Sequence, residues 1–165
     1  MLHNMSQVLN GDHKLKLIHH EKLISTLALK LKSDCPQLKP PSWALFVKTC
    51  PANFEPPKST DWWYIRAASL MRKMAIKGSM GLRDFRLQYG GKRKSGARPE
   101  KSRMAAGGHL RRILIQLENA KLVQKDKGRG RALTKEGLAF VDSAVNAIIQ
   151  KTLDQNPSLR LYVGE

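Results

Sequence analysis

Residues 61–77 read DWWYIRAASLMRKMAIK, and this stretch decides the fold of the chain. At the turn of about 100° per residue in an α-helix, its small and apolar side chains fall on one face and cations fall on the opposite face. The small and apolar face comprises Tyr64, Ala67, Ala68, Met71, Met74 and Ala75, and the basic face comprises Arg66, Lys73 and Lys77. The pattern predicts a central amphipathic helix that is buried on one side and charged along its outer edge.

Weaker patterns on both sides of residues 61–77 predict further helices. Apolar residues recur at helical spacing over residues 14–32 and again over 109–121. A short helix is expected over residues 43–49, because Ser42 can accept a hydrogen bond as its N-cap. These helices supply additional apolar faces that can pack around the central one.

A basic hairpin is expected directly after the helix over residues 109–121. Gly128 and Gly130 lie between two short β-compatible runs, and Thr134 can then cap a last helix. Helix, basic hairpin and helix in this order are typical of a winged-helix module. The predicted fold is therefore mainly α, a winged-helix-like helical bundle around the central helix with one short β-hairpin wing.

The chain is expected to form a single domain over residues 14–155, between a flexible N-terminal tail at 1–13 and a C-terminal tail at 156–165. Within it, residues 80–108 hold eight Lys/Arg and six glycines without a sustained apolar period. A long basic, glycine-rich loop is predicted there, and loops of this length are usually functional or disordered. We expect this loop to be disordered in the free protein.

Positive charge is concentrated in the middle of the chain. The 165 residues carry a net charge of +17, and residues 61–134 hold 19 of the 30 Lys/Arg but only five of the 13 acids. Clustering of this kind predicts a polyanionic partner, since self-repulsion otherwise destabilises the fold. The candidate residues for contact with this polyanion are Trp62, Arg66, Arg72, Lys73, Lys77, Arg83, Arg86, Lys92, Arg93, Lys94, Arg98, Lys101, Arg103, Arg111, Arg112, Lys125, Lys127, Arg129 and Arg131.

Two aromatic residues in this region have alternative interpretations. Tyr89 precedes Gly90-Gly91 and either stacks on a base or anchors the local packing. Trp62 either packs against RNA or a neighbouring protein, or pins the central helix to its own core. The residue types alone leave both pairs of alternatives open.

The sequence provides no recognisable pattern for catalysis, metal binding or membrane insertion. A phosphate-binding P-loop fails because Arg86 and Arg93 stand where glycine and Ser/Thr are needed. Cys35, Cys50 and five histidines lack zinc-ligand spacing. No apolar run is long enough to cross a bilayer, and the first residues lack a secretory pattern. We therefore expect a non-enzymatic protein without catalytic residues, cofactor, metal, small-molecule substrate or membrane contact.

Several short motifs resemble one known family in order and spacing. They are Pro41-Ser42-Trp43, the run from Asp61 to Ser69, Tyr89-Gly90-Gly91-Lys92-Arg93-Lys94 followed by Pro99, Arg111-Arg112-Ile113-Leu114, and Gly130-Arg131 with Leu133-Thr134 and Gly137. Together they resemble the S-nineteen-e family of small-subunit ribosomal proteins in archaea and eukaryotes, which is unrelated to its bacterial namesake. The resemblance covers roughly residues 14–150.

The resemblance implies a structural constituent of the small, 40S-type ribosomal subunit. It implies rRNA binding in the head of that subunit, a role in small-subunit rRNA maturation, and contacts with neighbouring small-subunit proteins. It further implies a monomer within the cytoplasmic ribosome, with a nucleolar assembly stage in a eukaryote. The alternative from the residues alone is a winged-helix DNA-binding regulator, in which Gln116 and Asn119 read base edges.

Overall fold

The computed structural model describes residues 15, 16, 18–126, 128 and 130–155. The predicted tails and two of the candidate RNA contacts lie outside the described residues, at 1–13, 156–165, Lys127 and Arg129. In the part of the chain that is described, no helix combines the length and the apolar character needed to span a membrane.

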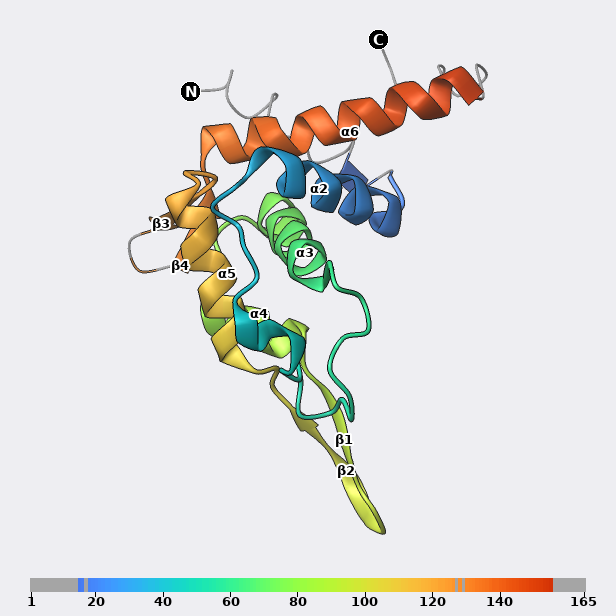
Figure 1. The fold of residues 1–165 in the computed structure, drawn as a ribbon, viewed down its shortest axis with the longest axis vertical. Coiled ribbons are helices and arrows are strands. Elements are labelled where there is room, and N and C mark those ends of the chain that lie inside the picture. Colours follow the sequence, from blue (N-terminus) through green and yellow to red (C-terminus); the bar gives the residue numbers. More distant parts are fainter. Residues whose placement is uncertain (1–14, 17, 127, 129, 156–165) are drawn as a thin grey trace.

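The helix predicted over residues 61–77 is present as α3 (Trp62–Lys77) and lies at the centre of the fold. It packs against α2 (His20–Asp34), α5 (Gly107–Asn119) and α6 (Lys135–Gln155), and it also contacts β4 (Gly130–Leu133). In Figure 1, α3 runs beneath α2 and α6. Its buried face comprises Trp62, Trp63, Ala67, Ala68, Leu70, Met71 and Met74.

The winged-helix layout is confirmed after α5. Strand β3 (Val123–Asp126) pairs antiparallel with β4, with Val123 opposite Leu133. Thr134 caps α6, because its Oγ1 accepts a hydrogen bond from the Gly137 N–H at 3.0 Å. The same hydroxyl donates to the Lys121 carbonyl at 2.7 Å, which ties the helix start to the end of α5. The wing is thus held between two helices.

The prediction of one long basic, glycine-rich loop over residues 80–108 was wrong. This segment contains a short helix, α4 (Leu82–Gln88), and a second hairpin formed by β1 (Gly91–Ser95) and β2 (Arg98–Arg103). The single predicted hairpin is therefore one of two in the described residues. No apolar period revealed it because nearly every side chain in its strands is exposed, and backbone hydrogen bonds carry the pairing.

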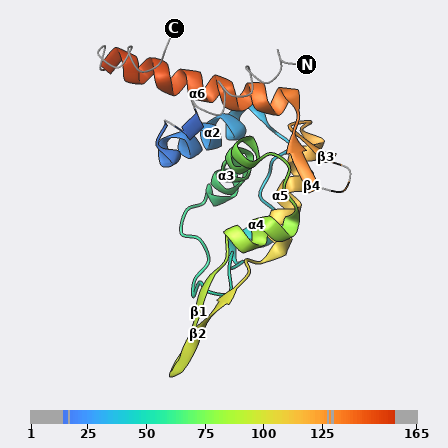
Figure 2. The same cartoon turned by 180° about the vertical axis from the view of Figure 1, so that it is seen from behind.

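A tight turn closes this second hairpin. Gly96 has a φ of 69°, and Ser95 pairs with Arg98 across it. A two-residue turn with positive φ at its first central residue favours glycine there. Figures 1 and 2 both show the β1–β2 hairpin extending away from the helices, at the end of the molecule opposite α6.

Two helix starts also differ from the predictions. Leu15 and Lys16 are helical, but residues 18 and 19 are not, so α2 begins only at His20. The short helix is a 3-10 helix, η1 (Ser42–Leu45), whose N-cap is Pro41 without a side-chain hydrogen bond. Ser42 itself is helical and cannot act as the cap.

Candidate nucleic-acid interface

The β1–β2 hairpin carries a dense group of free cations. All of them are exposed, and within the described residues none forms an ion pair. We call this group the hairpin cations: Lys92, Arg93, Lys94, Arg98, Lys101 and Arg103. Arg93 lies directly opposite Lys101 in the ladder. Their positive charges repel each other unless a bound anion neutralises them. The hairpin is therefore well suited to a polyanion.

The basic edge of α3 is ordered around one tyrosine. The Arg66 guanidinium carbon lies 4.1 Å from the centre of the Tyr89 ring, and the Lys73 ammonium lies 3.9 Å from it. The Tyr89 hydroxyl shares a hydrogen bond of 2.7 Å with Ser69. Of the two alternatives for Tyr89, the structure supports the packing anchor. The anchor fixes two predicted RNA contacts in place before any ligand arrives.

Burial and mutual repulsion act on these cations. Desolvation lowers the pKa of Arg66, and it also lowers the pKa of Lys73, to which the charges of Arg66, Lys77 and Arg72 contribute further. An anion that approached this edge would relieve the repulsion and favour the charged forms. The α3 edge is thus electrostatically prepared for phosphate.

A shallow cavity of about 400 Å³ lies beside this edge and is lined by Arg72, Lys73, Lys77, Ile76 and Gln88. The Nε of Arg72 is buried there without a hydrogen-bond partner in the described residues. A buried donor without a partner is costly, so Arg72 gains when its side chain turns toward an anion in the cavity. Three of the predicted contacts therefore converge on one concave surface.

Several predicted contacts are instead engaged within the fold. Arg86 donates from Nε to the Ala105 carbonyl at 3.0 Å, and Arg131 forms an ion pair with Glu118. Trp62 is only 7% exposed, and its ring meets those of Trp63 and His109 edge to face. This placement supports the interpretation in which Trp62 pins α3 to the core. These three side chains present little free surface to RNA.

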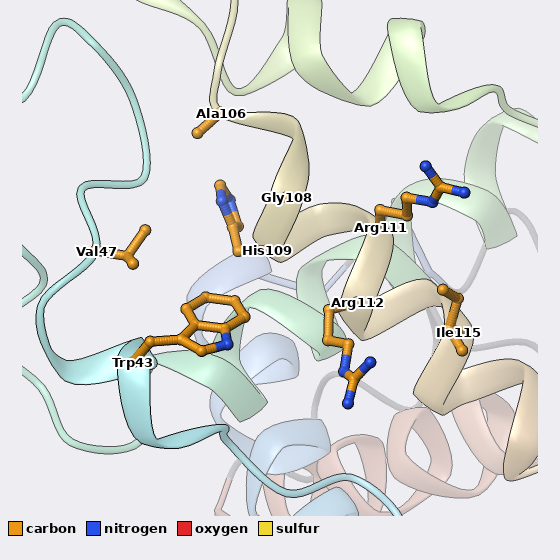
Figure 3. A pocket seen from close by; sticks show the side chains of 8 residues that line it. All are labelled: Trp43, Val47, Ala106, Gly108, His109, Arg111, Arg112 and Ile115. Atoms are coloured by element: carbon orange, nitrogen blue, oxygen red, sulfur yellow. The ribbon is translucent and has the colours of Figure 1, made fainter.

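The remaining described contacts are exposed. Arg83 lies on α4, Lys125 on the wing, and Arg111 and Arg112 on α5. The two α5 arginines line a second pocket of about 530 Å³, together with Trp43, Val47, Ala106, Gly108, His109 and Ile115 (Figure 3).

Sequence reasoning missed the two rings of this second pocket. From the sequence, Trp43 was noted only as part of a family motif and as the start of a short helix. His109 was noted only as one of five histidines without zinc-ligand spacing. The available signal for Trp43 was its place directly after Pro40-Pro41-Ser42, in a segment too short for a long buried helix. No sequence signal marks His109, because its burial at 1% exposed depends on the packing of α5 against α3.

His109 gives the fold a testable pH dependence. Burial, with a smaller contribution from the charge of Arg66, lowers its pKa to about 4 from the usual 6.5. Between these values the unfolded chain binds the proton and the folded chain does not, so stability falls as the pH falls. From about pH 7 to pH 5, we expect the free energy of unfolding to drop by about 2 kcal/mol through this group. Urea denaturation measures it, and His109→Phe should remove that part of the drop; an unchanged pH dependence in the variant would contradict the assignment.

The chain is similar in sequence to known proteins of one family. A profile described as Ribosomal protein S19e matches residues 14–151. The chain is 43% identical to small ribosomal subunit protein eS19 of Aeropyrum pernix over 86% of its own length and 93% of the relative. It is 33% identical to the protein of the same name from Thermoplasma volcanium, over 90% and 98% of the two chains. The protein of that name from Mya arenaria is 37% identical over 73% and 81%.

Proposed function

Since the chain belongs to the ribosomal protein S19e family, we propose that it is a structural component of the small ribosomal subunit and binds small-subunit rRNA. The hairpin cations, the basic edge of α3 and the two α5 arginines contact phosphates of more than one RNA strand. The role is structural rather than catalytic. It includes a place in the subunit head, neighbouring ribosomal proteins as partners, and support of small-subunit rRNA maturation. The protein acts as a monomer in the cytoplasmic ribosome, with a nucleolar assembly stage if the source is eukaryotic.

The observation that carries this proposal is the projecting hairpin with six exposed cations. Arginine suits bidentate phosphate contacts, and lysine adds mobile point charge. An arm of this length can reach between RNA segments that the body of the protein does not touch. RNA strands that pack tightly against each other need such neutralisation.

The alternative of a sequence-reading DNA regulator fits the structure less well. Gln116, one of its proposed base readers, accepts a hydrogen bond from the Trp63 indole at 2.9 Å. The same side chain donates to the Lys39 carbonyl at 2.7 Å. Both ends of its amide are therefore occupied inside the protein, and only Asn119 of the two remains exposed.

Co-sedimentation and a salt titration together test the proposed function. We expect stoichiometric protein in small subunits after a high-salt wash. With purified small-subunit rRNA, the logarithm of the binding constant should fall with the logarithm of the salt concentration at a slope steeper than about −3, because each phosphate contact contributes about −0.7 to −0.9. A shallower slope would argue against contacts to several strands, and absence of the protein from purified small subunits would argue against the ribosomal role.

A further inference from the structure

The pocket between η1 and α5 combines an aromatic wall, a buried polar wall and a cationic mouth. One wall is the Trp43 indole, which is 41% exposed and rests edge to face on Trp63 with ring centres 5.7 Å apart. Figure 3 shows this ring on the η1 side and the imidazole of His109 on the α5 side. The volume of about 530 Å³ lies within the range of roughly 300–1,000 Å³ usual for small-ligand sites.

His109 is the polar group on the inner wall of this pocket. It is 99% buried, and neither ring nitrogen has a hydrogen-bond partner among the described residues. A neutral imidazole has one N–H donor and one acceptor nitrogen, and leaving both unpaired in a buried site is costly. A ligand edge that carries an acceptor or a donor would pair with one of them, since the two nitrogens point in different directions from the ring.

The outer part of the pocket is cationic. Arg111 and Arg112 line it, and both are exposed. Helix α5 begins there, and no side chain caps its N-terminus. The unpaired backbone N–H groups at the start of a helix attract anions. The flat apolar wall suits the ring face of a nucleotide base, and the buried polar wall suits the polar edge of that base. The cationic mouth suits the phosphate of the same nucleotide.

We propose that this pocket binds a single unstacked base of the rRNA, which lies against Trp43, directs its polar edge to His109 and places its phosphate on Arg111 and Arg112. This inference rests on the proposed function and adds to it a contact with a base rather than with backbone alone. Aromatic platforms of this kind accept unpaired bases in RNA loops and bulges.

Nucleotide titration of the labelled full-length protein tests the pocket without any rRNA. The chain has three tryptophans, and Trp43→Phe identifies the Trp43 indole N–H signal. Millimolar adenosine 5′-monophosphate should shift that signal, whereas ribose 5-phosphate should not, since it offers phosphate without a base. No shift with the nucleotide, or equal shifts with both compounds, would overturn the proposal.

Variants then test whether rRNA uses the pocket. Trp43→Leu should weaken rRNA binding about tenfold with an unchanged salt slope, because a stacking surface is lost and no charge is removed. The matched control is Phe46→Leu, which alters an 81% exposed aromatic side chain just beyond η1 and should leave the affinity unchanged. Equal affinities for wild type and Trp43→Leu would refute base capture.

Loss of Trp43 could weaken rRNA binding by loosening the core, so a second variant tests the pocket with Trp43 in place. His109→Phe keeps a ring against Trp62 and removes both nitrogens, so it should retain the fold while reducing the nucleotide-induced shift severalfold. A full shift in this variant would contradict the role of His109. A shallow wild-type salt slope would count against the proposed function alone, because the nucleotide titration reports on the pocket independently.

Discussion

Replacing the six hairpin cations by glutamine is expected to reduce rRNA affinity by several orders of magnitude. Each cation that contacts a phosphate releases a counterion, so removing all six should make the salt slope shallower by about four. If the two binding curves meet near 1 M salt, that difference corresponds to up to about 10⁴-fold in affinity near 0.1 M. Filter binding or fluorescence anisotropy over a salt series measures both quantities.

A control variant with the same loss of charge distinguishes direct contacts by the hairpin from long-range attraction by the net charge of the protein. Six of the exposed lysines outside the proposed contacts can be changed to glutamine together: Lys16, Lys22, Lys39, Lys58, Lys135 and Lys151. Because only long-range attraction is lost, the slope should change by less than about one. Equal losses in the two six-fold variants would show that net charge, rather than the hairpin, drives binding.

Replacing Gly137 by alanine is expected to lower the free energy of unfolding by about 3 kcal/mol. A Cβ at this position of α6 would overlap the carbonyl oxygen of Leu122. That oxygen accepts the Thr134 N–H at 3.1 Å, so relief of the clash would disturb the junction of α5, the wing and α6. Helix propensity alone predicts the opposite sign, since alanine is favoured over glycine.

The matched control is Gly108→Ala in α5. Its Cβ would meet no atom within 4 Å, so this substitution should raise stability by up to about 1 kcal/mol through helix propensity. Urea titrations with equal m-values would give both differences. A neutral or stabilising effect of Gly137→Ala would contradict this prediction. It would show that α6 can shift away from the Leu122 carbonyl without loss of stability.

Periodicity was sufficient for the helices that bury one face. Residues 61–77 and 109–121 each place a compact apolar stripe on one side, and α3 and α5 match them within a few residues. Periodicity failed over residues 80–108, because the β1–β2 hairpin packs neither of its faces and α4 buries only Phe85. An element without a buried face leaves no hydrophobic signature.

The candidate contacts divide in the same way. Charge clustering identified the hairpin cations, and these are all exposed. The same reasoning could not separate them from Arg86 and Arg131, whose partners Ala105 and Glu118 lie 19 and 13 residues away in the chain. Whether a cation is free depends on which acceptor the fold brings next to it. The residues adjacent to the cation in the sequence do not reveal such a distant partner.

The sequence by itself determined the central helix, the winged order of elements, the family and the region of highest positive charge. Those properties depend on residue type and on spacing along the chain. Only the tertiary structure decided which cations remain free, that Tyr89 orders Arg66 and Lys73, and that His109 and Trp43 share one pocket. The physical reason is that burial and pairing arise between segments far apart in the sequence, where the cost of an unpaired charge or an unpaired ring nitrogen is set by the neighbours that packing supplies.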